Sequence, residues 1–198
     1  MKDSRIAPVF QILAEDIHAL GVRTVFGLMS DDTAVFAVTL DGLGVKFVGA
    51  RHENNAIAMA EGYAYATGEL GVAVIGRGPA TANGLHAAVA ASRMGSRVLV
   101  IYGDAAVGGG AVNGIGPDYK GFNAQAVLGA AGLTCFTAAS AATARQTLAD
   151  AVAAASRGAL AALLLPTNVQ MTNGVVWGPS PARLIPAGEA AGARPASN

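Results

Sequence analysis

Apolar residues follow two alternating patterns along the chain, one with helical spacing and one made of short continuous runs. In the first segment, residues 7–20, the apolar side chains recur at the spacing of one helix face. Further on, continuous apolar runs of the length typical of buried strands occur between polar or glycine-containing turns. These expected strands are residues 22–28, 45–50, 71–75, 97–102, 133–137 and 159–165.

Segments with helical character separate the expected strands. They are residues 31 or 32 to 40, the stretch after Arg51 to about 68, 80–94, 122–131, and 140 or 143 to 156. Either Asp31 or Asp32 is the expected N-cap of the first of these helices. Strands that alternate with helices predict an α/β fold, a doubly wound, six-stranded parallel sheet with helices on both faces.

Two stretches do not fit the alternation. Residues 103–120 form a long irregular segment around three consecutive glycines, which is typical of a functional or disordered loop. Residues 171–198 are rich in Gly, Pro and Ala and are expected to be a linker or tail. The chain is therefore expected to hold one domain, residues 1–170, followed by that tail.

Composition narrows the classes of partner. Of the 198 residues, 53% are hydrophobic and 13% charged, and the formal net charge is +0, so nothing predicts binding to nucleic acid. Cys135 is the single cysteine and the three histidines lack zinc-ligand spacing, so no disulfide and no metal site are expected. No apolar run reaches the roughly 20 residues of a membrane span, and the N-terminus does not resemble a signal peptide. We expect a cytoplasmic protein without membrane contact.

Glu53 is the candidate chemical residue, because it lies where a strand turns into an Ala-rich helix. The helix N-terminus favours its charged form and burial under a ligand favours its protonated form, so such a glutamate can be tuned for proton transfer. The simpler alternative is a carboxylate that only stabilises the first helical turn. Glu53, Gly78-Pro79 and the segment after Gly103 all follow expected strands, so they should share the sheet edge where ligands bind.

Several separated motifs resemble one known family. Arg51-His52-Glu53 with Ala60-Glu61-Gly62-Tyr63-Ala64, Leu20-Gly21-Val22 with Val25-Phe26-Gly27, Gly78-Pro79 with Asn83, and Leu165-Pro166 with Val169-Gln170 occur in the family's order. Together they resemble the pyrimidine-binding (PYR) domain of thiamine diphosphate enzymes of the acetolactate synthase, pyruvate decarboxylase and benzoylformate decarboxylase group. The resemblance covers about residues 5 to 170.

The resemblance implies a role for each matching position. The family's glutamate, here Glu53, hydrogen-bonds N1′ of the cofactor's aminopyrimidine and shuttles a proton there, which makes it the expected catalytic residue. Gly78, Pro79, Asn83, Met29 and Ser30 are expected to contact thiamine diphosphate, and Arg77 and His52 the substrate. Arg77 has an alternative as a surface or interface residue. The expected substrate is a small 2-oxo acid, which is decarboxylated and then protonated or ligated to an acceptor.

The chain also departs from the family's pattern. Met29-Ser30-Asp31-Asp32 stands where relatives carry Pro-Gly-Gly, and Arg77 stands where they carry Ser. The family's second domain holds diphosphate and magnesium through Gly-Asp-Gly and a later Asn, and Gly103-Asp104-Ala105 with Asn123 does not match that motif. A partner domain or subunit should therefore supply the diphosphate site and hold Mg²⁺, in a homo- or hetero-oligomer, and the chain alone should be inactive.

Three readings of the whole protein stay open on this basis. The chain is the small subunit of a split enzyme, similar to the alpha subunit of two-subunit sulfopyruvate or phosphonopyruvate decarboxylases, or a piece of a longer enzyme. The third reading is a non-catalytic flavodoxin-like interaction module. The helix after Glu53, with Ala56, Ala60 and Ala64 at spacings of four, could pack either against a subunit or against its own sheet.

Overall fold

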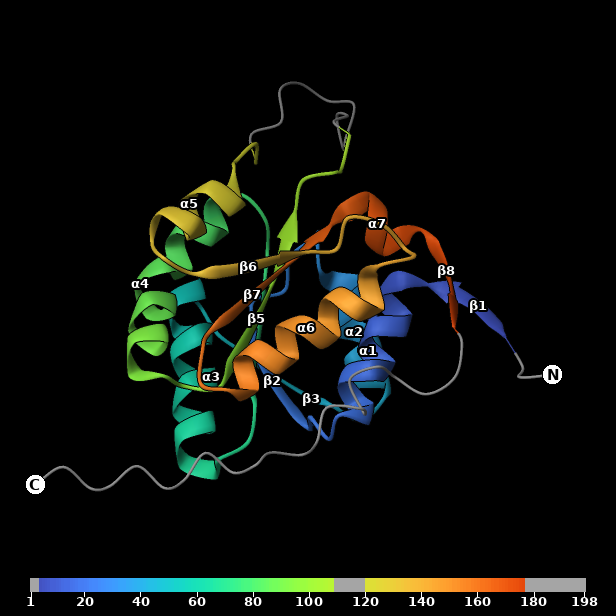
Figure 1. The fold of residues 1–198 in the computed structure, drawn as a ribbon. Coiled ribbons are helices and arrows are strands. Elements are labelled where there is room, and N and C mark those ends of the chain that lie inside the picture. The colour runs from blue at the N-terminus through green and yellow to red at the C-terminus, as the bar shows by residue number, and fades with distance from the viewer. Residues whose placement is uncertain (1–3, 109–119, 177–198) are drawn as a thin grey trace, which may run out of the picture.

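Strands and helices alternate in the computed structural model, which describes residues 4–108 and 120–176, as the hydrophobic pattern predicts (Figure 1). The six expected strands form one sheet in which every neighbouring pair is parallel. In spatial order they are β3 (Lys46–Gly49), β2 (Thr24–Gly27), β4 (Gly71–Ile75), β5 (Val98–Asp104), β7 (Ala161–Pro166) and β6 (Thr134–Thr137). The predicted fold class is thus confirmed.

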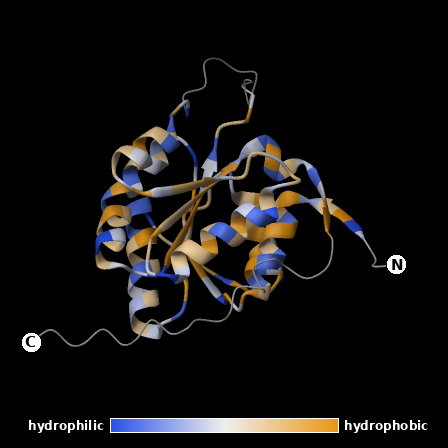
Figure 2. Cartoon of the chain, in the orientation of Figure 1, coloured by the Kyte–Doolittle hydropathy of each residue, from blue (hydrophilic) through white to orange (hydrophobic). Residues whose placement is uncertain are grey.

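Helices cover both faces of this sheet, and each face has its own hydrophobic core. One layer is formed by α1 (Val9–Ala19), α2 (Ala34–Gly42) and α6 (Ala144–Ser156). The opposite layer is formed by α3 (Glu53–Thr67), α4 (Pro79–Met94) and α5 (Ala124–Ala130). Figure 2 shows the apolar central strands between the two layers. Because both faces are covered, β4 and β7 are buried along their whole lengths, which explains their unbroken apolar sequences.

A reversal of the strand order beside β2 positions the site. From β2 the chain moves outward to β3, then returns to place β4 on the other side of β2. The loops that follow β2 and β4 therefore diverge at the carboxyl end of the sheet, which in open α/β sheets creates the crevice where ligands bind.

A small antiparallel ribbon lies outside the main sheet (Figure 1). It pairs β1 (Arg5–Pro8) with β8 (Asn173–Val176), and the short helix α7 (Thr167–Met171) leads into it. The tail was expected from residue 171, but residues 173–176 belong to this ribbon, because their backbone groups pair with the first strand of the chain. The remainder of the expected tail, 177–198, lies outside the described residues, as does most of the 103–120 segment.

Two further expectations are settled by packing. Ala56, Ala60 and Ala64 are buried against the chain's own sheet, so that face of α3 is not left for a subunit. The N-cap of α2 is Thr33, with no side-chain cap hydrogen bond, so the prediction of Asp31 or Asp32 is wrong. Within residues 4–108 and 120–176, no helix is both long and apolar enough to cross a membrane.

Candidate functional site

A cleft of about 500 Å³ opens at the carboxyl ends of β2 and β4. Its lining comes from the loop after β2, the start of α3, the β4–α4 turn with the first residues of α4, and Lys120 in the segment before α5. The lining residues are Leu28, Met29, Ser30, Asp31, Glu53, Gly76, Arg77, Pro79, Ala80, Asn83 and Lys120. Leu28, Met29, Pro79 and Ala80 supply apolar surface. Polar or charged side chains come from Ser30, Asp31, Glu53, Arg77, Asn83 and Lys120.

Glu53 is the first residue of α3 and reaches the cleft from the helix N-terminus. His52 caps this helix, because its Nδ1 accepts a hydrogen bond from the backbone N–H of Asn54 at 3.2 Å. Asn83 of α4 donates from Nδ2 to Oε2 of Glu53 at 3.1 Å. The carboxylate is therefore oriented by a neighbouring helix, and the other oxygen, Oε1, remains suited to a ligand's N–H or protonated nitrogen.

Close approach of α4 to α3 makes that hydrogen bond possible. A Cβ at Gly84 would lie 2.8 Å from the Cδ1 atom of Ile57 and 3.7 Å from the Cβ atom of Glu53. The glycine thus lets the two helices pack closely beside the glutamate. Asn54 makes a second hydrogen bond between α3 and α4, because its Oδ1 accepts from the backbone N–H of Ala87 at 2.9 Å.

The β4–α4 turn forms another wall of the cleft. Gly78 has φ +70°, a conformation that favours glycine, and a Cβ there would lie 2.5 Å from the carbonyl oxygen of Lys120. Pro79 follows as the first residue of α4, a position that needs no N–H donor. The turn therefore brings backbone, with no intervening side chain, against the segment that carries Lys120.

A buried ion pair lies beside the cleft. The Nε atom of Arg77 donates to Oδ1 of Asp32 at 2.7 Å, and the two side chains are only 3% and 4% exposed. Lys120 donates from Nζ to Oδ2 of Asp32 at 3.0 Å and also to Asp31. Ser30 donates to the same Asp32 oxygen at 2.9 Å, and Gln170 of α7 donates to the backbone oxygen of Asp32 at 2.6 Å. Asp32 thus connects four parts of the chain: the loop after β2, the β4–α4 turn, the segment before α5, and α7.

The environment shifts the pKa values of this cluster. Burial alone would raise the pKa of Asp32, but hydrogen bonds from Lys120, Ser30 and Arg77 outweigh it and hold that pKa below its ordinary value. Burial lowers the pKa of Lys120, but its hydrogen bonds to Asp31 and Asp32 outweigh that effect and raise it. At neutral pH both groups are therefore charged.

The structure brings most of the predicted site residues together. Glu53, Pro79, Asn83, Met29, Ser30 and Arg77 line one cleft, and Gly78 forms its adjoining turn. His52 is absent from the lining and serves as the cap of α3. Arg77 is buried, so the alternative of a surface position is wrong, because its guanidinium pairs with Asp32 inside the fold. No contact with a substrate or cofactor tests the other assigned roles.

Sequence reasoning missed the charged cluster. Asp31 and Asp32 were assigned to a helix cap, and Lys120 was only the end of a long loop. A signal was present, since two adjacent carboxylates follow a buried strand in a chain with 13% charged residues. Their shared partner, Lys120, is 89 and 88 positions away in the sequence, which no local pattern reveals. Asn123, considered with Gly103-Asp104-Ala105 as a diphosphate motif, instead caps α5 by accepting from the N–H of Ala126.

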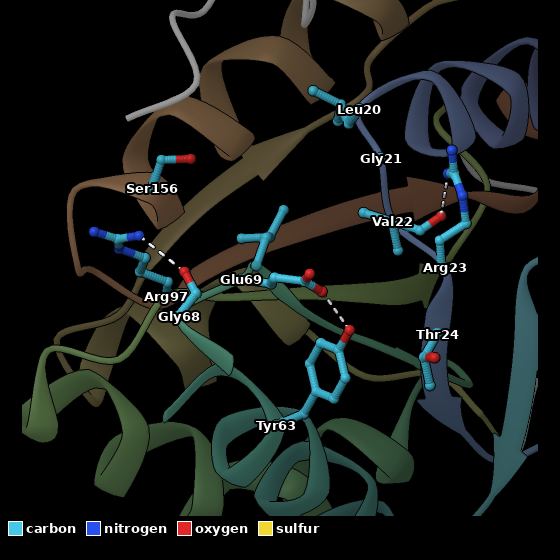
Figure 3. Close-up of a pocket in the computed structure, with 11 residues that line it drawn as sticks. Leu20, Gly21, Val22, Arg23, Thr24, Tyr63, Gly68, Glu69, Arg97 and Ser156 are labelled. Atoms are coloured by element: carbon cyan, nitrogen blue, oxygen red, sulfur yellow. Dashed lines mark hydrogen bonds between the residues drawn. The ribbon is translucent and has the colours of Figure 1, made fainter. Parts of the chain in front are cut away.

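A second cleft of about 500 Å³ lies at the opposite, amino end of the strands (Figure 3). Its most polar features are already paired within the chain: Tyr63 donates to Glu69, and Arg97 donates to the backbone oxygen of Gly68 at 3.0 Å. The hydrogen bond to Glu69, with a smaller effect of burial, raises the pKa of Tyr63. The two clefts have the same volume, so size does not indicate which one is the ligand site. The carboxyl-end cleft is the candidate, because it has an oriented glutamate and the position expected for this fold.

The carboxyl-end cleft fits one part of the expected cofactor. Leu28, Met29 and Pro79 would supply apolar contacts to an aromatic ring, and the Glu53 carboxylate would supply a hydrogen-bond partner for a ring nitrogen. The described residues contain no group of three or more His, Cys, Asp or Glu that could hold a metal ion. The Glu53 carboxylate and the apolar side chains beside it suit the aminopyrimidine part of the cofactor.

Comparisons with known proteins point to the same family. The family model "Thiamine pyrophosphate enzyme, N-terminal TPP binding domain" matches residues 8–122, more than half of the chain. 2-Hydroxyacyl-CoA lyase 2 of Danio rerio is 34% identical over 94 residues, which are 48% of this chain and 15% of that protein. Acetolactate synthase large subunit IlvG of Mycobacterium tuberculosis is 34% identical over 98 residues, 48% of this chain and 17% of that protein.

A third relative is named as a decarboxylase. "Probable 2-ketoarginine decarboxylase AruI" of Pseudomonas aeruginosa is 35% identical over 83 residues, 42% of this chain and 15% of that protein. The matched segment thus spans about a sixth of the length of these curated relatives.

Proposed function

The chain belongs to the thiamine pyrophosphate enzymes, as their N-terminal TPP binding domain, and from this premise we propose a role in cofactor activation. The proposed protein is the pyrimidine-binding component of a thiamine diphosphate-dependent decarboxylase or carboligase that acts on a small 2-oxo acid. The names of the acetolactate synthase and 2-ketoarginine decarboxylase relatives support this class of reaction. A cytoplasmic location is part of the proposal, and a chain with Cys135 as its single cysteine suits a reducing compartment.

The observation that carries the proposal is the placement of Glu53. Its carboxylate enters a ligand-sized cleft at the switch point of the sheet and is held by Asn83 through one oxygen. Thiamine diphosphate, when bound, supplies the carbanion chemistry that amino-acid side chains lack. Glu53 would hold the proton at N1′ of the aminopyrimidine, and Asn83 would fix the orientation of the Glu53 carboxylate.

The rest of the cleft would position the ring. Leu28, Met29 and Pro79 offer apolar contacts to its faces, and Met29 is 56% exposed, so its flexible side chain can adapt to a ligand. The positive φ of Gly78 favours glycine, so this turn of the cleft wall carries no side chain that could obstruct a ligand. Water would be excluded from Glu53 by these groups together with a covering domain, which strengthens its hydrogen bond to a ring nitrogen.

The proposal also includes a partner domain. The donors in the cleft suit the pyrimidine, and a diphosphate-binding domain, on another chain or elsewhere in a longer one, would hold Mg²⁺ and the diphosphate. The small share of each relative's length that this chain matches supports this division. We therefore propose a homo- or hetero-oligomer, with no catalysis by the isolated domain.

Exchange of the cofactor's C2 proton for deuterium tests the proposal directly. The chain would be combined with its diphosphate-binding partner, thiamine diphosphate and magnesium, and exchange followed by proton NMR. Glu53→Gln keeps the shape of the side chain but cannot transfer the proton, so exchange should slow by roughly 10²- to 10⁴-fold. Glu69→Gln is the matched control, since it removes the same charge at the opposite, amino end of the sheet. Exchange of the C2 proton should not change in this variant. Wild-type exchange in Glu53→Gln would remove Glu53 from the mechanism.

A further inference from the structure

The mouth of the cleft contains a lysine held between two carboxylates of unequal burial. Lys120 donates from Nζ to both Asp31 and Asp32, and its side chain is 16% exposed. The Asp31 side chain is 62% exposed, whereas that of Asp32 is 4% exposed. Water screens exposed ion pairs and makes them weak, so the contact with Asp31 can be given up far more easily than the contact with Asp32.

Asp32 is the fixed member of this arrangement. It also accepts hydrogen bonds from Arg77 and Ser30, and its own backbone oxygen is held by Gln170. Removing any donor from a buried carboxylate is costly, because the charge would be left without compensation. Asp32 therefore keeps the Lys120 ammonium at the cleft while Asp31 can be replaced.

The backbone beneath Lys120 is also positioned. Its carbonyl group packs against Gly78, where a Cβ would lie 2.5 Å away, so the residue is seated directly on the β4–α4 turn. Arg77, the other cation that lines the cleft, is 3% exposed and lies between Asp32 and Asp104, with which it also interacts electrostatically. Of these two cations, Lys120 is the one that an incoming anion meets.

We propose that Lys120 determines the specificity of the cleft for acids, by exchanging Asp31 for the carboxylate of the 2-oxo acid substrate while Asp32 holds the ammonium in place. This inference rests on the proposed function and names the residue that would receive the acid group. Glu53 and Lys120 line the same cleft, and an ionised Glu53 carboxylate would repel that of the substrate, whereas the Lys120 ammonium would attract it.

The test uses the complex of the chain with its diphosphate-binding partner, loaded with thiamine diphosphate and magnesium. Binding of oxamate, an unreactive analogue of a 2-oxo acid, is measured by titration calorimetry, and KM is measured for the 2-oxo acid that is turned over. Lys120→Met should weaken oxamate and raise KM by roughly ten- to a hundredfold, the range for a lost hydrogen bond to a charged group, with a smaller change in kcat. Lys120→Arg should retain oxamate binding within about threefold.

The variant Asp31→Asn gives an independent and opposite expectation. Removing the carboxylate that competes for Lys120 should tighten oxamate binding by about two- to fivefold, in keeping with the small strength of an exposed ion pair. Lys46→Met, at the exposed amino end of β3, is the matched control and should bind oxamate as the wild type does. Circular dichroism and thermal unfolding check that each variant is folded.

Four outcomes separate the possibilities. Wild-type oxamate affinity in folded Lys120→Met, or weaker binding in Asp31→Asn, overturns the inference. Weaker thiamine diphosphate binding with unchanged oxamate binding in Lys120→Met also overturns it, because the ammonium would then serve a phosphate group. Absence of C2 proton exchange in the wild-type complex instead overturns the proposed function, while the oxamate titration still reports on Lys120 by itself.

Discussion

At the scale of single residues, one buried carboxylate organises the wall of the cleft. Asp32 accepts hydrogen bonds from side chains that follow β2 and β4 and from Lys120, the last residue of the 103–120 segment, and it is 6% exposed as a whole residue. Its local sequence, a pair of aspartates before an apolar helix, favours an N-cap. Asp32 instead forms the ion pair with Arg77, because this pair satisfies two buried charges, whereas a cap hydrogen bond satisfies one backbone N–H.

Replacing this carboxylate should destabilise the fold in a pH-dependent manner. Asp32→Asn removes the charge with which the buried Arg77 guanidinium makes its 2.7 Å ion pair, so the free energy of unfolding should fall by roughly 3 kcal/mol at pH 7. The folded pKa of Asp32 lies below the ordinary value of about 3.9, so its stabilisation is complete above that pH and is lost as the pH falls through the folded pKa. The difference between the two proteins should therefore shrink only in strong acid.

Urea unfolding from pH 7 downward measures this difference. Asp41→Asn, at the exposed end of α2, removes the same charge without breaking a buried pair and should change stability by less than about 0.5 kcal/mol. A difference between wild type and Asp32→Asn that stays constant at all pH values would show that the charge of Asp32 is not the source of its contribution.

At the scale of elements, the position of Glu53 depends on how closely α3 packs on the sheet. A Cβ at Gly71 would lie 2.0 Å from the backbone oxygen of Ala60 and 3.2 Å from the Cβ atom of Ala64. The small residues of α3 thus face a strand position that has no side chain, and the helix backbone lies directly on β4. This contact sets the distance between the sheet and α3, the helix whose first residue is Glu53.

Two glycine substitutions on opposite sides of α3 should therefore have opposite effects. Gly71→Ala forces the helix away from β4 and should destabilise the protein by about 1–3 kcal/mol, the usual cost of overpacking. Gly62→Ala lies on the exposed face of the same helix, with no heavy atom within 4 Å of the added Cβ, and should stabilise by about 0.5–1 kcal/mol.

Chemical denaturation of the two variants and the wild type provides the measurement. Because Gly71→Ala moves the helix that carries Glu53, it should also slow C2 proton exchange in the partnered complex, whereas Gly62→Ala should not. Equal stability of the two variants would mean that α3 can shift freely over the sheet, contrary to the packing described.

At the scale of the whole molecule, the first and last described strands close the fold. Pairing of β1 with β8 joins Arg5–Pro8 to Asn173–Val176, and the backbone N–H of Val9 donates to Thr172 at 3.0 Å. Gly174 lies against Ile12 of α1, since an added Cβ would be 3.1 Å from its Cδ1 atom. The stretch after Gln170 therefore belongs to the domain at least as far as Val176.

Truncation tests this closure. A chain that ends at Gln170 loses the ribbon and should be less stable than a chain that ends at Val176 by roughly 2–4 kcal/mol, the sum of several hydrogen bonds and some apolar burial. Thermal and urea unfolding of the two truncated chains, measured side by side, checks this expectation. Equal unfolding midpoints would show that β1 and β8 contribute nothing to the fold.

Much of this organisation could be predicted from the sequence because it depends on local signals. The unbroken apolar runs of β4 and β7 identify strands that are covered on both faces, and Gly68, with φ +73°, ends α3 where a helix-terminating glycine was expected. The ribbon was not predicted, since Asn173–Val176 is short, and its strand character depends on pairing with residues at the other end of the chain.

For this protein, the sequence by itself determined the alternation of elements, the fold class, and the strand-to-helix position of Glu53, because hydrophobic period and turn residues act over a few neighbours. Only the tertiary structure decided that Asp32 pairs with Arg77 and Lys120, and that Asn83 holds Glu53. Those partners lie 45, 88 and 30 positions away, and they meet because the strand order reverses at β2. Burial then makes each charge require its partner, a condition that exists only once the chain has folded.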